Sequence, residues 1–372
     1  MPESFKVTPW EVTGTIDYAK LEREFGIKPL KPLLPRIPDA THFHRRDIIF
    51  GHRDFERILE AIAHKKPYAM LTGLMPSGKF HLGHATVAKQ FLYYQDHGAQ
   101  IAICVADLEA HATRGLSLAE CRTMAVEEYL TNYIALGLKP KGVDFYFQSA
   151  RSADPVRSNA YYRLIGELAR RPTMNEMTAV YGELTPGKIM SALTQAADIL
   201  HLQLPEFGGP KPIVVPVGAD QDPHLRLTRD LAARMSQYQF VPPSATFNKF
   251  MPGLKGGKMS SSDPLSYIAL TDSPEQAADK IRKHAFSGGK GNLADHRKFG
   301  GDPEVDVAFQ MLRFLLEPDD KKLAKIEADY RSGKLLTGDL KSYCIDKLSA
   351  FLKDVQKKRP AARKQVEKFL KA

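Results

Sequence analysis

An early part of the chain alternates short apolar runs with longer amphipathic stretches. Tyr68–Thr72, Gln100–Ala106 and Val143–Phe147 have the composition of strands that are buried on both faces. His84–Gln95 and Ser117–Leu136, which lie between them, have the spacing of amphipathic helices. A strand–helix–strand–helix–strand order of this kind predicts a doubly wound sheet of parallel strands. We therefore expect an α/β protein with a Rossmann-like fold.

The rest of the chain suggests three parts. Residues 1–60 are expected to form an N-terminal extension, with a short strand at Val7–Val12, a helix at Asp17–Phe25 and a proline-rich connector. Residues 61–270 are expected to form the Rossmann-like domain, and residues 271–372 an all-helical domain. Four further features are expected within the middle part: a helical insertion at about 155–205, a strand at Pro212–Val217, a helix at Asp222–Met235, and mostly loop from 242 to 264.

Composition and charge restrict the class of protein. No run approaches the roughly 18 apolar residues of a membrane span, and the N-terminus lacks the pattern of a signal peptide, so we expect a cytoplasmic protein without membrane contact. Three cysteines do not suggest a disulfide framework, and Cys104 lies in an apolar run that favours core packing. The net charge of +10 suits a polyanionic partner, although a solvated lysine-rich surface would give the same number.

The turn after the first strand carries glycines and two histidines. Gly73 and Gly78 allow a tight turn, and the start of the next helix directs free N–H groups toward a bound anion. The absence of a side chain at Gly83 would let a flat ring such as adenine lie on the backbone. His81 and His84 are three residues apart and fall on one side of the first helical turn, where they could donate to a phosphate. They could also be capping residues or zinc ligands, but no third ligand with suitable spacing is nearby.

A second segment, Lys255–Ser262, combines glycines with a cation and hydroxyl groups. Lys258 supplies a point charge, and Ser260 and Ser261 add donors, so the segment could close over β- and γ-phosphates and stabilise a leaving pyrophosphate. A segment of this composition is, by itself, more often an ordinary surface loop. Together with the histidine turn, it predicts that the two segments hold the two ends of a triphosphate.

Both segments resemble the signature sequences of class I aminoacyl-tRNA synthetases: His81-Leu82-Gly83-His84 and Lys258-Met259-Ser260-Ser261-Ser262. The second carries serine where the usual form has another lysine, which places more weight on Lys258 as the pyrophosphate contact. Other segments, spread over nearly the whole chain, are similar to tryptophanyl-tRNA synthetases of the archaeal and eukaryotic type. They include Pro9-Trp10, Gln195–Ile199, Asp220–His224, His284–Gly289, His296–Gly301 and Leu336–Lys341.

The resemblance implies site residues by position. It assigns the α-phosphate to His81 and His84, the pyrophosphate to Lys258, Ser260 and Ser261, the nucleotide to Thr72, Gly73, Gly83, Met259 and Lys258, and the amino and carboxylate groups of the amino acid to Glu109, Gln195 and Gln221. Leu71 and Cys104 replace a tyrosine and a glutamine that reach the indole in eukaryotic members. We therefore expect Asp198 to accept the indole N–H, as in bacterial relatives, although it could be a structural carboxylate or accept a phenol O–H instead.

The family implies a tryptophan–tRNA ligase. Such an enzyme uses ATP and Mg²⁺ to make tryptophanyl-adenylate, transfers the acyl group to tRNA(Trp), and works as a homodimer without a metal site of its own. The helical C-terminal part would read the anticodon, and Val7–Val12 could form a lid over the pocket or remain a terminal arm. A tyrosine-specific enzyme and a non-catalytic tRNA-binding protein are the alternatives, and the presence of His81, His84 and Lys258 speaks against the second.

Overall fold

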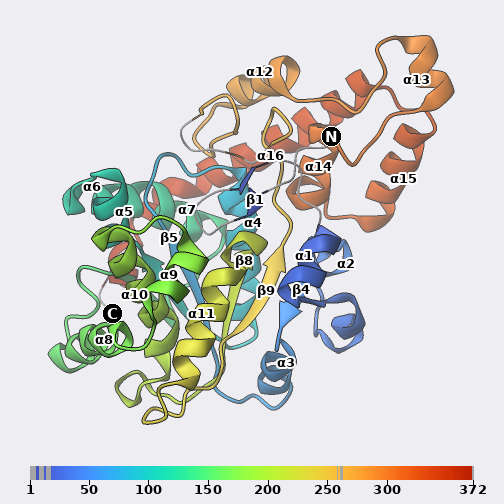
Figure 1. Cartoon of the computed structure of the whole chain (residues 1–372). Coiled ribbons are helices and arrows are strands. Elements are labelled where there is room, and N and C mark those ends of the chain that lie inside the picture. Colours follow the sequence, from blue (N-terminus) through green and yellow to red (C-terminus); the bar gives the residue numbers. More distant parts are fainter. Residues whose placement is uncertain (1–5, 8–11, 14–17, 258, 260–262, 371–372) are drawn as a thin grey trace.

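The computed structural model describes residues 6–7, 12–13, 18–257, 259 and 263–370. Its centre is a seven-stranded sheet in the order β3-β4-β9-β8-β5-β6-β7, with helices packed on both faces (Figure 1). The strands are β3 (Lys28–Pro29), β4 (Ile49–Arg53), β5 (Ala69–Leu74), β6 (Gln100–Val105), β7 (Val143–Phe147), β8 (Ile213–Gly218) and β9 (Ser244–Asn248). Strands β5 to β9 run parallel to one another, and β4 runs antiparallel to both of its neighbours, β3 and β9. The predicted α/β class with a parallel core is confirmed.

Most of the described residues outside the sheet are helical. The α-helices are α1 (Tyr18–Phe25), α2 (His42–Arg45), α3 (Glu56–Ala63), α4 (Leu82–Asp96), α5 (Asp107–Arg114), α6 (Leu118–Met124), α7 (Thr131–Leu136), α8 (Pro155–Ala169), α9 (Met174–Tyr181), α10 (Pro186–Leu200), α11 (Asp222–Ala233), α12 (Pro274–His284), α13 (Leu293–Phe299), α14 (Val307–Met311), α15 (Asp320–Arg331), α16 (Thr337–Arg363) and α17 (Glu367–Leu370). A π-helical turn, Ala125–Leu130, joins α6 to α7, so the long helix predicted over Ser117–Leu136 is continuous.

The two faces of the sheet bury different sets of side chains, because successive residues of a strand point to opposite sides. Met70 and Ile103 belong to a large apolar cluster that also contains Phe91 of α4 and Leu348 of α16. Residues of the other set, such as Cys104, pack in a second cluster on the opposite face. Cys104 is fully buried there, so the prediction of core packing for this cysteine is confirmed.

The order of the parallel strands creates a switch point. The chain passes from β5 through β6 to β7 on one side, and then returns so that β8 and β9 lie on the other side of β5. In open α/β sheets, ligands bind outside the carboxyl ends of the strands at such a point. The turn after β5 and the segment after β8 both leave the sheet at this edge.

One strand of the parallel core contradicts the sequence prediction. Ser244–Asn248 was expected to be loop, yet it forms the fully buried strand β9 between β4 and β8. The sequence does not predict this strand, because prolines flank the segment and because it contains short polar side chains. Two of these polar groups have tertiary partners: Ser244 Oγ donates to the Asp54 carbonyl at 2.8 Å, and Thr246 Oγ1 shares a 3.4 Å hydrogen bond with the Tyr94 hydroxyl.

The N-terminal region also differs from the prediction. It contributes β3 and β4 to the edge of the sheet, and part of the proline-rich connector forms a 3₁₀ helix, Lys31–Arg36. The single strand expected over Val7–Val12 is wrong, because β1 (Lys6–Val7) pairs antiparallel with β2 (Val12–Thr13). The residues between these two strands lie outside the described part. The proposed lid and the division of the chain into three parts stay predictions.

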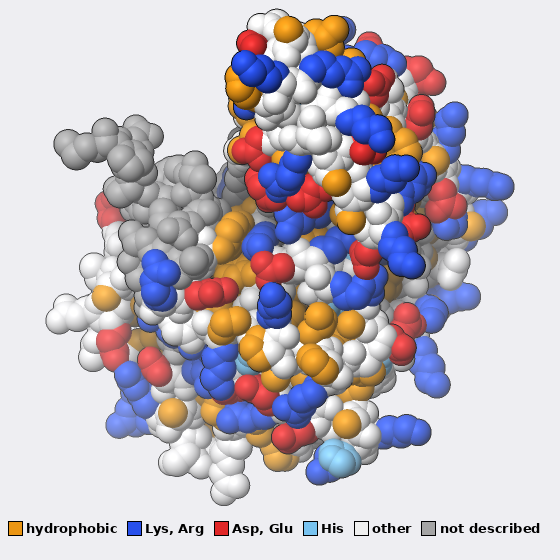
Figure 2. All heavy atoms as spheres, turned by 90° about the vertical axis from the view of Figure 1, so that its right-hand side faces the viewer, with side chains coloured by type: hydrophobic (Ala, Val, Ile, Leu, Met, Phe, Trp, Pro, Cys, Tyr) orange, Lys and Arg blue, Asp and Glu red, His pale blue; other side chains and the backbone are white. Residues whose placement is uncertain are grey.

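The predicted helical stretches near 155–205 and after residue 273 contain α8 to α10 and α12 to α17 respectively. Figure 2 faces the side of the molecule near α2, α13 and α15, where lysine and arginine side chains are scattered among acidic ones. Among the described helices, none is long and apolar enough to cross a membrane.

Candidate active site

The turn between β5 and α4 places the two histidines against each other. His81 is the N-cap of α4, one residue before Leu82, so the helix begins slightly earlier than predicted. The His81 backbone N–H donates to Nδ1 of His84 at 3.2 Å, and the two rings stack with centroids 3.7 Å apart. The prediction that both rings lie on one side of the first helical turn is confirmed.

Both imidazoles are neutral in this arrangement at pH 7. Burial lowers the pKa of His81 to about 4, and burial together with the neighbouring His81 lowers the pKa of His84 well below its ordinary value. Because Nδ1 of His84 accepts a hydrogen bond, the single ring proton of neutral His84 resides on Nε2. His84 is thereby fixed as an Nε2–H donor, which suits a phosphate oxygen.

The second signature segment lies beside the first. A side chain added at Gly83 would place its Cβ 3.0 Å from Cε1 of His81 and 3.4 Å from Sδ of Met259. The chain just after this segment pairs with the histidine turn: the Leu82 N–H donates to the Ile268 carbonyl at 3.1 Å, and the Leu270 N–H donates to the Phe80 carbonyl at 2.9 Å. Lys258, Ser260 and Ser261 lie outside the described residues. Met259 and the chain that follows the second segment therefore meet the histidine turn at the start of α4.

The residues assigned to the amino acid surround the carboxyl ends of the central strands. Glu109 lies on α5, Gln195 and Asp198 lie on α10, and Gln221 follows β8. Gln195 Nε2 donates to Gln221 Oε1 at 3.5 Å. Burial raises the pKa of Glu109, an effect that Ser191 of α10 partly opposes.

Thr72 and Gly73 lie near the carboxyl end of strand β5, next to the residues assigned to the amino acid. Gly73 pairs with Cys104 of β6, and Cys104 pairs with Tyr146 of β7. A Cβ added at Gly73 would meet no atom within 4 Å. Open space therefore exists beside this row of residues, where a substrate could enter.

Asp198 is the centre of a buried hydrogen-bond network. Its Oδ1 accepts from the hydroxyls of Tyr146 at 2.9 Å and Tyr161 at 2.8 Å, and its Oδ2 accepts from Gln148 Nε2 at 2.7 Å. Burial raises the pKa of Asp198, and these three donors lower it. Sequence reasoning did not identify the partners. The available signal was the polar Tyr146 and Gln148 at the carboxyl end of a predicted strand.

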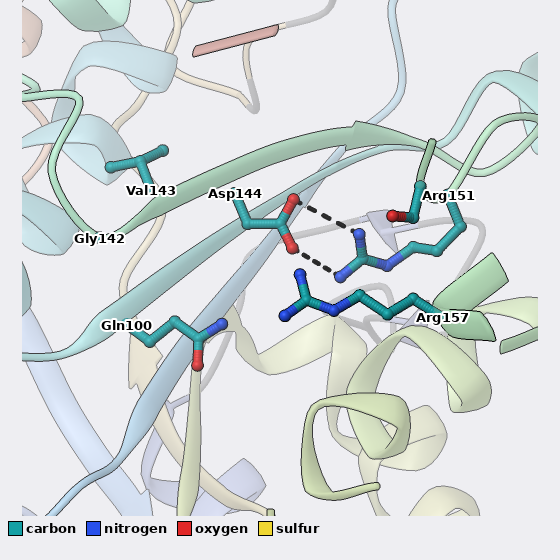
Figure 3. A pocket seen from close by; sticks show the side chains of 7 residues that line it. Gln100, Gly142, Val143, Asp144, Arg151 and Arg157 are labelled. Atoms are coloured by element: carbon teal, nitrogen blue, oxygen red, sulfur yellow. Dashed lines mark hydrogen bonds and ion pairs between the residues drawn. The ribbon is translucent and has the colours of Figure 1, made fainter. Parts of the chain in front are cut away.

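Arg151 supports this network through contact with the Tyr146 ring. Its guanidinium lies 3.9 Å from the centroid of the Tyr146 ring, donates from Nε to His201 Nε2 at 2.8 Å, and forms a 2.6 Å ion pair with Asp144. Figure 3 shows the Arg151–Asp144 pair lining a cavity of about 280 Å³ near the amino ends of β6 and β7. None of the predicted site residues lines this cavity.

Within the described ranges, no group of three or more His, Cys, Asp or Glu side chains is arranged to hold a metal ion.

Buried histidines make stability depend on pH. Burial lowers the pKa of His81 and His44 to about 4 and that of His224 to about 3, from an ordinary value of 6.5. Below pH 6.5 the unfolded chain binds protons that the folded chain does not, so stability present at pH 7 is lost as the pH falls toward 4. We expect the free energy of unfolding in urea to drop by about 2 kcal/mol per histidine between pH 7 and pH 5.

A variant tests this dependence. In the unmodified protein, Nδ1 of His44 accepts a hydrogen bond from the Thr41 backbone N–H at 3.1 Å. The His44→Gln variant retains a side-chain acceptor for this N–H. This variant should lose less stability than the unmodified protein over the same pH range, and an equal loss would contradict the assignment.

Comparison with known proteins gives a consistent result. A model of the family "tRNA synthetases class I (W and Y)" matches residues 63–353. The tryptophan–tRNA ligase of Aeropyrum pernix is 47% identical, with 96% of each chain covered, and that of Methanocaldococcus jannaschii is 44% identical, with 98% of each covered. The crystal structure of the Aeropyrum pernix tryptophanyl-tRNA synthetase matches with a TM-score of 0.90 over 95% of this chain and 96% of its own. The Plasmodium falciparum tryptophanyl-tRNA synthetase matches with a TM-score of 0.83 at 31% identity, over 95% of each chain. The chain therefore belongs to the class I tRNA synthetases of the tryptophan and tyrosine type and, within them, to the tryptophan–tRNA ligases.

Proposed function

We propose that this chain activates L-tryptophan with ATP and transfers the activated amino acid to tRNA(Trp), releasing AMP and pyrophosphate. The observation that carries the proposal is the approach of Met259 to the histidine turn at the switch point of the sheet, where a Cβ added at Gly83 would lie 3.0 Å from Cε1 of His81 and 3.4 Å from Sδ of Met259. Family membership supports tryptophan as the amino acid.

Activation needs no side-chain nucleophile. A carboxylate oxygen of tryptophan attacks the α-phosphorus of ATP, and the bond from that phosphorus to the β-phosphate oxygen breaks as pyrophosphate leaves. His84 donates from Nε2 to the α-phosphate, and His81, stacked on it, contacts the same group. Such positioned donors stabilise negative charge that develops in the transition state.

Other residues position the two substrates. Thr72, Gly73, Gly83 and Met259 line the nucleotide site, and Lys258 with Ser260 and Ser261 stabilises the leaving pyrophosphate. Glu109, Gln195 and Gln221 hold the amino and carboxylate groups of tryptophan, and the Asp198 network receives its side chain. The hydrogen bond between Gln195 and Gln221 supports this grouping.

Mg²⁺ is proposed to accompany ATP. The side chains fit an ion that is held mainly by substrate phosphates and water, since the described residues form no cage of metal ligands. When bound, the ion would neutralise part of the charge on the phosphates.

The acyl group then passes to a hydroxyl of the terminal adenosine of tRNA(Trp), and family resemblance favours the 2′-hydroxyl. The helical residues 271–372 are proposed to read the anticodon. The exposed rings of Phe286 and Phe299, with Lys298 Nζ 4.9 Å from the Phe299 ring centroid, offer stacking surfaces for unpaired bases beside positive charge.

A homodimer in the cytoplasm is proposed as the working form. Large apolar side chains are exposed on the helices α8, α9 and α10, which favours contact with a second protein surface. They are Val156, Tyr162, Met174 and Met190.

Pyrophosphate exchange into ATP tests the proposal. Exchange should require L-tryptophan, with little response to L-tyrosine, and equal stimulation by both would overturn the choice of substrate. The Lys258→Ala variant should lower the exchange rate roughly 10²-fold, the scale of losing one group that stabilises transition-state charge. An unchanged rate would remove Lys258 from the mechanism.

A further inference from the structure

Gln148 presents a buried acceptor that has no partner. It follows β7 directly, and its backbone N–H donates to the Val105 carbonyl at 3.1 Å, so it continues the pairing of β7 with β6. Its side chain is only 1% exposed, and Nε2 donates to Asp198 Oδ2. Within the described part of the chain, Oε1 makes no hydrogen bond. A buried polar atom without a partner is costly, and each such atom calls for an explanation.

Asp198 fixes which end of the Gln148 amide is left over. An ionised carboxylate accepts hydrogen bonds and donates none, so the amide can face it only through Nε2. Asp198 is already engaged by Tyr146 and Tyr161 in addition to Gln148. The Asp198 carboxylate thus holds the Gln148 amide so that Oε1 points away from Asp198.

The position of Gln148 suits contact with the substrate side chain. It lies two residues beyond Tyr146, at the end of the row that joins Gly73, Cys104 and Tyr146 across three strands. The space above Gly73 is open at the start of this row. Leu71 and Cys104, which lie on the same face of the sheet, offer no strong acceptor for an indole N–H.

We propose that Oε1 of Gln148 accepts the hydrogen bond from the indole N–H of the substrate, and that Asp198 positions the glutamine for this contact. The assignment rests on tryptophan being the substrate. It replaces the direct contact that the sequence suggested for Asp198 with an indirect one. Gln148 thereby distinguishes a substrate ring that carries an N–H donor from a ring of the same shape that lacks one.

An analogue that lacks the donor tests the proposal. In 3-benzothienyl-L-alanine a sulfur atom replaces the indole N–H while the ring keeps nearly the same shape. The unmodified protein should prefer tryptophan by about 10- to 100-fold in kcat/KM for pyrophosphate exchange, because the analogue leaves Oε1 unpaired. Gln148→Met should bring this ratio close to 1, mainly through a higher KM for tryptophan.

Gln90 provides a matched control. It is a buried glutamine on α4 whose Oε1, like that of Gln148, makes no hydrogen bond to the described residues. Gln90→Met should leave the preference for tryptophan unchanged. Thermal unfolding would verify that the variants are folded, and Gln148→Leu provides a second substitution if Gln148→Met does not fold.

The outcomes distinguish a failure of this inference from a failure of the proposed function. If folded Gln148→Met, or Gln148→Leu in its place, keeps the full preference for tryptophan, another group reads the indole and the inference is overturned while the proposed function stands. If the unmodified protein shows no tryptophan-dependent exchange, the proposed function fails and the inference fails with it.

Discussion

Replacing His84 with alanine is expected to slow tryptophan-dependent pyrophosphate exchange by about 10²- to 10³-fold, the usual cost of removing one preorganised donor to a developing negative charge. The hydrogen bond from the His81 N–H to Nδ1 of His84 holds the ring in the Nε2–H form. A donor fixed in advance needs no reorganisation during the reaction. The fall should therefore appear in kcat, with the KM for tryptophan little changed, since His84 acts at the phosphate and not at the indole.

Two further variants isolate the chemical role of His84. His84 also caps α4, and loss of a cap typically costs about 0.5–2 kcal/mol of stability. His84→Gln retains an acceptor for the His81 N–H but removes the imidazole, so its kcat should still fall steeply while its unfolding free energy stays closer to that of the unmodified protein. His97→Ala, at the other end of the same helix, should leave the rate within a factor of about two. A normal rate in both His84 variants would exclude His84 from the mechanism.

The parts of the fold that were predictable are those encoded locally. β5, β6 and β7 are apolar runs of strand length, and α4 begins where a glycine-rich turn ends, so each could be recognised within a few residues. The stacking of His81 on His84 was likewise predictable from their spacing in a helical turn.

The parts that were missed depend on partners far along the chain. β9 is short and polar, and becomes a strand because β4 and β8 pair with its two edges. β4 itself lies in a segment that was assigned to an appendage, and its pairing with β9 joins residues about two hundred positions apart. No local pattern contains this information, because the pairing is decided by the tertiary structure.

The candidate site shows the same division. Sequence motifs identified Asp198, but its donors come from β7 and α8 as well as from the end of the strand, and only folding brings Tyr146, Tyr161 and Gln148 to one carboxylate. The sequence motif therefore identified Asp198 as a candidate site residue but did not reveal its role. A carboxylate with this many donors is first a structural anchor, and in the proposal made above its contact with the substrate passes through the groups that it holds.

Replacing Asp198 with alanine is therefore expected to lower the free energy of unfolding by about 3–5 kcal/mol, a loss in the upper range for a single substitution. The change leaves the Tyr146 and Tyr161 hydroxyls and Gln148 Nε2 without their acceptor in a buried site. Because the Gln148 amide is then free to turn, the KM for tryptophan should rise in the same variant. Urea unfolding at pH 7 and exchange kinetics measure the two effects.

Asp279 is a suitable control, since it is also an aspartate with more than one partner but is 57% exposed and pairs with Arg282 and Lys283 at the surface. Water can replace those partners, so Asp279→Ala should cost about 1 kcal/mol or less and leave the KM for tryptophan unchanged. Asp198→Asn keeps one acceptor oxygen and should fall between the two alanine variants in stability. If Asp198→Ala is as stable as Asp279→Ala, the buried network does not hold this part of the fold, and the positioning role of Asp198 has to be abandoned.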